Sequence, residues 1–358
     1  MFGNIYKGKR ILVTGHTGFK GSHLCAWLHR LGAEVCGIAL EPDQSPDHFS
    51  LLKLPLRSEI CDIRSYEKCF RIFQDFQPEI VFHLAAQPLV RESYRNPRIT
   101  FETNVTGSMN ILESCRDTES VRAVVMVTTD KCYSNTENAR PFTEEDPLGG
   151  HDPYSASKAA SEILAASYRL SFFAPEGRVA LATARAGNVI GGGDWAQDRL
   201  IPDLIRGAVK GAVTPVRFPG AVRPWQHVLE ALSGYLLLGQ KLYEDGQKFA
   251  SGWNFGPVEK EIYTVLDVIK LACRQWDKIR FVCEEEGKNI FHEAAHLTLD
   301  CTKAQALLQW HPVWNTEQAV CQTIGFYRDF YEQGVLRTFS VLDAYEKEAR
   351  EKNLPWVE

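Results

Sequence analysis

The sequence has no long hydrophobic run. No stretch approaches the roughly 18 consecutive apolar residues that a membrane-spanning helix requires, and residues 1–10 lack the apolar core of a secretory signal. We therefore expect a protein that is neither secreted nor embedded in a membrane and that works in the cytoplasm.

Excess positive charge and paired cysteines are also absent. The 40 Lys and Arg residues stand against 45 Asp and Glu residues, so the chain lacks the cationic surplus that a nucleic acid backbone attracts. The 10 cysteines are irregularly spaced and none forms Cys-x-x-Cys, which argues against a zinc ribbon and a disulfide framework. We expect reduced thiols, no metal site and no nucleic acid partner.

The first half of the chain alternates short apolar runs with helical patterns. Buried strands are predicted at 10–13, 34–38, 80–82, 123–127 and 179–184, with helices at 20–31, 66–76, 96–116 and 154–172. Strands that alternate with helices indicate a parallel, doubly wound sheet with right-handed crossovers. The predicted fold class is α/β, with a Rossmann-type sheet and a smaller α/β domain that binds substrate.

A glycine-rich loop, Thr14–Gly21, follows the first strand and opens the first helix. Gly15, Gly18 and Gly21 permit a tight turn and a close backbone approach, while the helix start offers N–H groups to a pyrophosphate. In this setting the loop predicts a dinucleotide site. Residues 39–41 include no basic side chain to receive a 2′-phosphate, which favours NAD over NADP.

The residues that hold the adenosine end stay open. The second strand ends at Leu40 without an acidic residue, so either Glu41 binds the ribose or the cofactor is held loosely. Asp62 and Ile63 follow the next short strand and suit the adenine edge, although a surface turn explains the same pair.

The pattern changes after Arg185, where glycines and prolines interrupt it. We assign 1–186 and 226–256 to the NAD-binding domain, 187–225 and 257–340 to the substrate domain, and 341–358 to a C-terminal tail. A helix at 228–243 is expected to pack back onto the sheet.

A catalytic pair is predicted at the start of the 154–172 helix. Tyr154 and Lys158 are four residues apart and share a helix face, where the lysine charge, with the nicotinamide charge nearby, would lower the pKa of the phenol towards the working pH. Thr128–Lys131 follow a buried strand and reach the ligand-binding edge of the sheet. There Thr129 can fix a substrate hydroxyl and Asp130 can act as a general acid. The plain alternatives are a solvated helix turn and a strand-end turn.

Taken together, these motifs and three further stretches, His83–Ala86, Arg185–Asn188 and Arg223–His227, resemble the extended short-chain dehydrogenase/reductase family over roughly 8–314. Within it, 14–22 and 129–133 are similar to the nucleotide-sugar 4,6-dehydratases. The resemblance implies a hydro-lyase that acts on CDP-glucose with NAD, in deoxysugar synthesis for lipopolysaccharide O-antigen. It also implies a homodimer or a dimer of dimers, paired through the helices at 96–116 and 154–172.

The resemblance assigns roles to particular residues. The catalytic set is Thr129, Asp130, Lys131, Tyr154 and Lys158. The cofactor set is Gly15, Thr17, Gly18, Phe19, Gly21, Asp62, Ile63, Leu84, Ala85, Ala86, Asn104, Thr128, Tyr154 and Lys158. The substrate set is Gln87, Asn188, Arg199, Arg223 and His227, with the two arginines and Asn188 on the pyrophosphate. For either arginine, a surface salt bridge is the alternative.

Lys131 departs from the related dehydratases, which usually carry glutamate at this position. Either a Lys131 with a depressed pKa removes the C5 proton, or a charged Lys131 stabilises the enolate while another group takes that proton.

Three rival functions are weighed against the dehydratase. An epimerase of the same fold needs no proton donor at position 130, and a non-catalytic NAD-binding regulator would not keep Tyr154 and Lys158 intact. Residues 291–296 contain His-Glu-x-x-His, a zinc protease motif, but strand-like residues follow at 297–300 and leave too little helix. We interpret this last motif as a loop that enters an edge strand.

Overall fold

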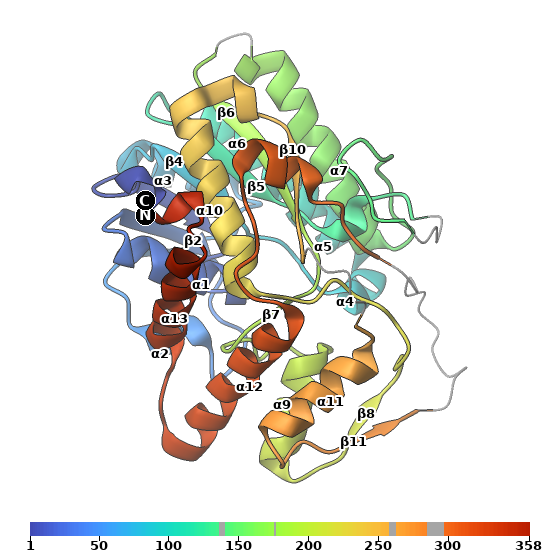
Figure 1. Ribbon diagram of the computed structural model, residues 1–358. Helices are drawn as coiled ribbons and strands as arrows, with labels where there is room; N and C mark the ends of the chain where they lie inside the picture. Colours follow the sequence, from blue (N-terminus) through green and yellow to red (C-terminus); the bar gives the residue numbers. More distant parts are fainter. Residues whose placement is uncertain (136–139, 175–176, 258–262, 285–296) are drawn as a thin grey trace.

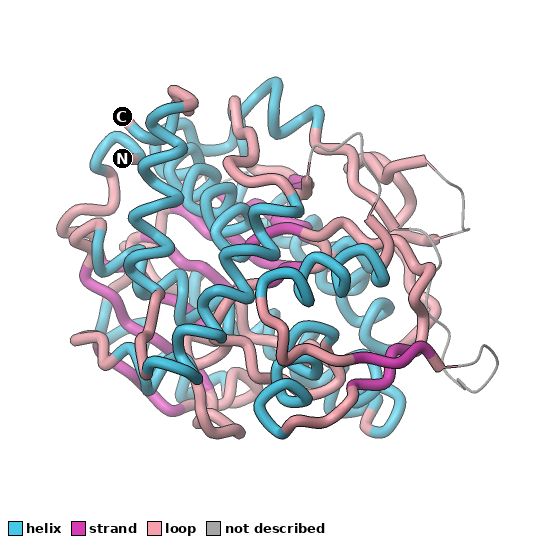
Figure 2. The backbone as a smooth tube through the Cα atoms, turned by 60° about the horizontal axis from the view of Figure 1, so that its bottom comes forward, coloured by secondary structure: helices cyan, strands magenta, loops and turns pink. Residues whose placement is uncertain are grey.

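The computed structural model in Figure 1 describes residues 1–135, 140–174, 177–257, 263–284 and 297–358. A twisted sheet forms the centre, with helices on both faces, and a smaller lobe lies at one end (Figure 1 and Figure 2). The two chain termini lie side by side on the large domain, away from the smaller lobe (Figure 1).

The sheet has seven parallel strands, as the alternating pattern predicts. They are β1 (Arg10–Thr14), β2 (Glu34–Ala39), β3 (Arg57–Ile60), β4 (Ile80–His83), β5 (Ala123–Val127), β6 (Ala180–Ala186) and β10 (Gly252–Phe255). Their order across the sheet is β10-β6-β5-β4-β1-β2-β3. The chain reverses direction across the sheet between β1 and β4, the position where ligands bind in such folds.

Successive side chains of each strand enter opposite cores. On one face, α3 (Tyr66–Phe76), α6 (Ser108–Arg116) and α7 (Pro153–Tyr168) pack on Leu12 and Val124. On the other face, α1 (Phe19–Arg30), α10 (Val228–Asp245) and α13 (Thr338–Glu351) pack on Ile11 and Val125. The prediction that the helix at 228–243 packs back onto the sheet is confirmed.

The helix predicted at 96–116 is divided into three parts. These are α5 (Pro97–Phe101), the π-helical segment η2 (Glu102–Gly107) and α6. A second π-helical segment, η4 (Arg169–Phe173), continues α7. Short π-helical segments are frequent at functional sites, and η2 contains Asn104 from the predicted cofactor set.

The smaller lobe has its own apolar core. Its elements are α9 (Leu200–Lys210), β8 (Thr214–Val216), α11 (Val265–Gln275), β11 (Phe281–Cys283) and α12 (Thr316–Gln333). The core includes Ile205, Val268 and Tyr327. The short strands β7 (Val189–Ile190) and β9 (Gln226–His227) pair beside it. This placement fits the predicted substrate domain, whose boundaries stay a prediction.

The segment named as a C-terminal tail is folded against the large domain. Besides most of α13, it includes the turn η7 (Pro355–Val357), in which Trp356 is buried and stacks on Phe2 with the ring centroids 5.2 Å apart. The remaining short elements are η1 (Phe2–Asn4), α2 (His48–Leu52), α4 (Val90–Arg95), η3 (Asp130–Cys132), η5 (Gly246–Phe249) and η6 (Ala304–Leu308).

The His-Glu-x-x-His motif lies outside the described residues. After it, Leu299 forms a single parallel bridge with Phe142, and helical structure begins at Thr302. The residues that the structure describes contain no helix that is long and apolar enough to span a membrane. They also contain no cluster of His, Cys, Asp and Glu that could hold a metal ion.

Candidate active site

The predicted site residues meet at the carboxyl edge of the sheet. The glycine loop follows β1, Leu84–Ala86 follow β4, and Thr128–Lys131 follow β5. Tyr154 lies in the first turn of α7, which begins at Pro153 after the capping residue Asp152. Tyr154 is 8% exposed and Asp130 is 2% exposed, so the chemistry is placed where water has little access.

The glycine loop forms a cradle that larger residues would block. Gly15 has a φ of +76°, and a Cβ there would lie 2.8 Å from the Ala85 nitrogen. A Cβ on Gly21 would lie 2.0 Å from the Gly15 carbonyl oxygen. Thr14 Oγ1 accepts hydrogen bonds of 3.1 Å from the backbone N–H groups of Leu84 and Ala85, which join the β1 and β4 loops. The cradle fits a dinucleotide pyrophosphate beside the start of α1.

Three further residues of the predicted cofactor set have contacts of their own. Thr17 donates to the Leu40 carbonyl at 2.9 Å, and Ile63 packs against Gly107. The Asp62 carboxylate is occupied by Arg64 at 2.6 Å, and this hydrogen bond lowers the pKa of Asp62. A contact of Asp62 with adenine, as predicted, would therefore compete with the Asp62–Arg64 ion pair.

Tyr154 and Lys158 both lie in the buried face of α7. Burial raises the pKa of Tyr154 to about 12, against the lowering effect of a hydrogen bond with Thr129. The lowering expected from Lys158 together with the nicotinamide charge stays a prediction. The Lys158 ammonium donates to the Val127 carbonyl at 3.2 Å, and burial lowers the pKa of Lys158 to about 8. The low polarity of the site thus favours the neutral form of both groups.

Asp130 has one satisfied and one unsatisfied oxygen. Oδ1 accepts from the Thr129 hydroxyl at 2.9 Å, whereas Oδ2 is buried with no hydrogen-bond partner among the described residues. Burial raises the pKa of Asp130, although the Lys131 charge and the Thr129 hydrogen bond lower it in part. A buried carboxyl with a raised pKa and a vacant oxygen has the properties of a general acid.

The structure gives several residues of the predicted sets other partners. Thr128 donates to Glu162 inside the core. Asn104 Nδ2 donates to Ser157 at 2.9 Å, and its Oδ1 accepts from the Gln87 backbone at 2.8 Å. The Gln87 side chain in turn contacts Leu89 and Thr100. Asn104 and Gln87 therefore connect the β4 loop to α7, and their predicted ligand contacts stay untested.

The substrate-side arginines approach the same centre from the smaller lobe. Arg199 pairs with Asp194 at 2.8 Å and lowers the pKa of Tyr154 through its charge. Arg223 acts in the same way on Asp130. Asn188 accepts a backbone hydrogen bond from Gln226 at 3.1 Å.

His227 lies apart from these side chains. It is 1% exposed, and its Nδ1 accepts from the Leu229 backbone at 3.3 Å, so it caps α10. Its role towards substrate stays a prediction.

Lys20 is a candidate site residue that the sequence reasoning missed. It follows Phe19 in the glycine loop, where Thr17, Phe19 and the glycines were assigned to the cofactor and Lys20 was not. Burial and the Arg199 charge lower the pKa of Lys20 to about 8, while the Asp130 charge raises it.

A cavity of about 560 Å³ lies against α9 and β8 of the smaller lobe. It is lined by residues that include Arg91, Arg206, Lys210, Arg217, Asp198 and Asp203. Asp198 directly precedes Arg199 and pairs with Arg91 at 3.1 Å across the two lobes. The catalytic residues do not line this cavity.

Known proteins resemble the chain in sequence and in fold. It is 46% identical over 332 residues to the CDP-glucose 4,6-dehydratase of Salmonella typhimurium, covering 91% of this chain and 92% of that one. It is 28% identical over 354 residues to the dTDP-glucose 4,6-dehydratase of Haemophilus influenzae, covering 88% and 97% of the two chains.

Solved structures share the fold. The UDP-glucose 4-epimerase of Thermotoga maritima, with UDP-glucose, superposes with a TM-score of 0.78 at 24% identity over 90% of this chain and 100% of that one. The dTDP-glucose 4,6-dehydratase of Streptomyces venezuelae, with NAD bound, gives 0.76 at 24% identity over 91% and 98%. Residues 11–251 match the model of the NAD dependent epimerase/dehydratase family. With this match and the 46% identical relative, the chain belongs to that family.

Proposed function

We propose that the protein is an NAD-dependent hydro-lyase that converts CDP-D-glucose to CDP-4-keto-6-deoxy-D-glucose. The observation that carries the proposal is the Asp130 carboxyl, buried beside Tyr154 with Oδ2 unpartnered among the described residues. Its raised pKa suits a group that must protonate a departing hydroxyl. The 46% identical relative that acts on CDP-glucose supports the choice of nucleotide.

The Gly15–Gly21 cradle would hold NAD, which would supply hydride transfer from C4 to C6 of the sugar. Tyr154 takes the proton of the C4 hydroxyl, and Thr129, hydrogen-bonded to the phenol, orients that hydroxyl. Because burial favours the neutral phenol, the base form of Tyr154 depends on nearby cations such as Arg199.

The elimination of water uses the β5 loop. The 4-ketone acidifies the C5 proton, and Asp130 donates its proton to the C6 oxygen, so that water leaves across C5 and C6. Arg199 and Arg223 bind the diphosphate from the smaller lobe. When the hydride returns to C6, the group that took the C5 proton returns it to C5, so the net result is dehydration without a change in the overall oxidation state.

Two roles of Lys131 in the removal of the C5 proton are considered. Either a neutral Lys131 takes the proton, or a charged Lys131 stabilises the enolate while another group takes it. A Lys131→Gln variant distinguishes them. The first version expects the exchange of solvent deuterium into C5 to fall sharply, and exchange at the normal rate contradicts it.

The second candidate function is a nucleotide-sugar 4-epimerase. The fold favours neither reaction, since solved epimerases and dehydratases superpose on the chain with similar TM-scores, 0.78 and 0.76. An epimerase has no hydroxyl to expel and therefore no use for the buried Asp130 carboxyl.

We also propose a homodimer, or a dimer of two such dimers, formed by α5, α6 and α7. Apolar side chains are exposed along these helices and η4: Ile99, Phe101, Met109, Ile163 and Leu170. Burying such a surface against a second copy would be favourable. We place the protein in the cytoplasm, where its product would supply deoxysugars for cell-surface polysaccharide such as O-antigen.

Incubation with NAD and CDP-glucose, UDP-glucose or dTDP-glucose in parallel tests the proposal. We expect a product that has lost one water from CDP-glucose, identified by mass spectrometry and by the new methyl signal at C6 in NMR spectra. A product of unchanged mass with inverted C4 would instead establish the epimerase.

A further inference from the structure

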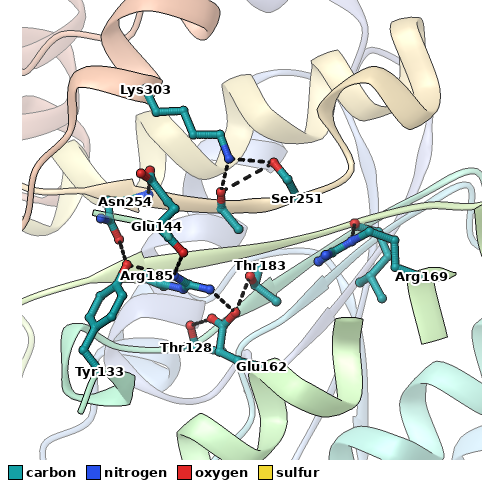
Figure 3. Close-up of polar contacts among 12 residues, drawn as sticks. Thr128, Tyr133, Glu144, Glu162, Arg169, Thr183, Arg185, Ser251, Asn254 and Lys303 are labelled. Atoms are coloured by element: carbon teal, nitrogen blue, oxygen red, sulfur yellow. Dashed lines mark hydrogen bonds and ion pairs between the residues drawn. The ribbon is translucent and has the colours of Figure 1, made fainter. Parts of the chain in front are cut away.

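A buried ion pair beneath the β5 loop takes no part in the mechanism above. Glu162 of α7 and Arg185 of β6 approach to 2.8 Å, with side chains only 2% and 6% exposed. Figure 3 shows the pair within a network that extends from Thr128 to Asn254. Buried charges are costly unless every group around them is satisfied, so the network demands an explanation.

Glu162 holds the first end of the catalytic loop. Its Oε1 accepts from the Thr128 hydroxyl, and its Oε2 accepts from Thr183 at 2.7 Å as well as from Arg185. Thr128 is the first residue after β5, so this contact fixes the point where the loop leaves the sheet.

Arg185 holds the other end of the loop. Its Nη1 donates to the Tyr133 hydroxyl at 2.8 Å and to the Glu144 carbonyl at 3.2 Å. The Tyr133 hydroxyl donates to Asn254 Oδ1 at 2.7 Å, and its ring stacks on Phe142 with centroids 5.0 Å apart. Tyr133 is thus fixed by β6, by β10 and by a ring contact.

Asp130 and Lys131 lie between these two fixed ends. Asp130 Oδ2 has no partner of its own among the described residues, so the loop backbone determines where its proton points. Of the groups assigned to oxidation, Tyr154 and Lys158 are carried by the helix α7, and Thr129 lies in the loop.

We propose that the Glu162–Arg185 pair and Tyr133 are positioning residues that hold both ends of residues 128–133 and so serve the elimination step more than the oxidation step. This inference rests on the proposed dehydratase function. Its physical basis is that misplacing a reacting group by about 1 Å costs on the order of 10²-fold in rate.

Tyr133→Phe is the sharpest variant, because it removes one hydroxyl and keeps the ring on Phe142. Glu162 is less suitable, since its charge also raises the pKa of Lys158 and a change there would disturb both steps. Arg185→Lys serves as the second variant, because it keeps the charge but loses the two-sided contact. Tyr345→Phe is the matched control: it removes a buried hydroxyl that contacts Glu230 at 2.7 Å, away from the loop.

The experiment follows a single turnover with NAD and CDP-glucose. Oxidation is read from the near-ultraviolet absorbance of reduced nicotinamide, and elimination from the loss of water. For Tyr133→Phe we expect elimination to slow by on the order of 10-fold to 10²-fold, so that the reduced nicotinamide persists and a 4-keto sugar that retains its C6 hydroxyl accumulates. Arg185→Lys should also slow elimination more than oxidation, and Tyr345→Phe should change neither rate.

The positioning role is overturned if Tyr133→Phe slows both steps equally or neither of them. Backbone amide exchange provides a readout that needs no activity: the variant should lose protection across 128–133, and unchanged protection also overturns the inference. If the parent protein forms no dehydrated product, the proposed function fails instead, and the exchange data still report whether the loop is held.

Discussion

At the scale of single residues, the two oxygens of Asp130 have different surroundings. Oδ1 is bonded to Thr129, while Oδ2 faces Gly187, where an added Cβ would lie 2.9 Å away. The same Cβ would lie 2.3 Å from Pro224 Cγ. The surroundings of the Asp130 carboxyl are therefore set by burial and by the close approach of a loop from the smaller lobe.

Replacing Asp130 by Asn should separate the two halves of the reaction. An amide cannot donate the proton to O6, so formation of the 6-deoxy product should fall by about 10²-fold to 10⁴-fold while oxidation at C4 continues.

Because burial raises the pKa of Asp130, its protonated form persists to higher pH, and elimination in the parent should decline as the pH rises through that pKa. Product analysis of the parent and of Asp130→Asn across a pH series checks both predictions. If the variant lost oxidation at C4 as strongly as elimination, Asp130 would not be the general acid of the elimination step.

Gly187→Ala should impair the site without removing a functional group. The new methyl group must displace Pro224 or the Asp130 carboxylate, so the rate of product formation should fall at least about 10-fold. Gly220→Ala is the matched control, since a Cβ there meets no heavy atom within 4 Å. Steady-state kinetics of both variants test this prediction. If Gly187→Ala were as active as Gly220→Ala and the parent, the close contact of Gly187 with Asp130 and Pro224 would not matter for the rate.

Strand ends and helix spacing pointed to Thr129, Asp130, Tyr154 and Lys158 as candidates, and the structure brings these four residues to one edge of the sheet. The same signals did not point to Lys20, because the charges that act on it, those of Arg199 and Asp130, come from distant parts of the sequence. Nor could a helix spacing show how strongly burial raises the pKa of Tyr154.

At the scale of elements, the strand at 123–127 and the helix at 66–76 were predicted with the bounds that the structure shows. The helix at 96–116 was predicted in one piece, since the π-helical turns of η2 keep the helical direction and the single Gly107 at their end does not break the helical pattern. The C-terminal helix α13 was missed because its burial depends on α1, some 300 residues earlier in sequence. That packing places Trp356 against Phe2.

The first turn of α10 contains a buried acid that should tune stability. Glu230 accepts hydrogen bonds from the backbone of Val313 and Trp314 at 2.9 and 2.7 Å and from Tyr345, and burial raises the pKa of Glu230 to about 7 from 4.5. The folded state therefore binds this proton more tightly than the unfolded state, and stability should be lost as the pH rises from about 4.5 through 7, by up to about 3 kcal/mol.

Glu230→Gln removes this titration. The variant loses an acceptor and should be less stable than the parent near pH 5, but the difference in free energy of unfolding should narrow towards pH 8. Denaturant unfolding at several pH values measures it. A constant difference would mean that Glu230 does not titrate in this range.

At the scale of the whole molecule, the predicted assembly depends on a surface that no single motif encodes. Ile163 is 60% exposed on α7, the helix that carries the predicted catalytic pair, and Leu170 is 71% exposed on η4, which continues that helix. A second copy packed there would stabilise the face of α7 that lies opposite the active site.

Ile163→Glu should weaken the dimer, since it places a charge in an apolar contact. Size-exclusion chromatography with light scattering should show a shift towards monomer. Leu307→Glu is the control, because Leu307 is also 60% exposed but lies in η6, away from these helices. An unchanged mass for Ile163→Glu would exclude α7 as the interface.

The central claim is that one hydride leaves C4 and returns to C6 of the same sugar. CDP-glucose that carries deuterium at C4 tests this most directly, with the position of the label in the product read by NMR. We predict a 4-keto-6-deoxy product with deuterium in its C6 methyl group. Deuterium retained at C4 of an epimerised sugar, or absent from C6 of a dehydrated one, would contradict the account.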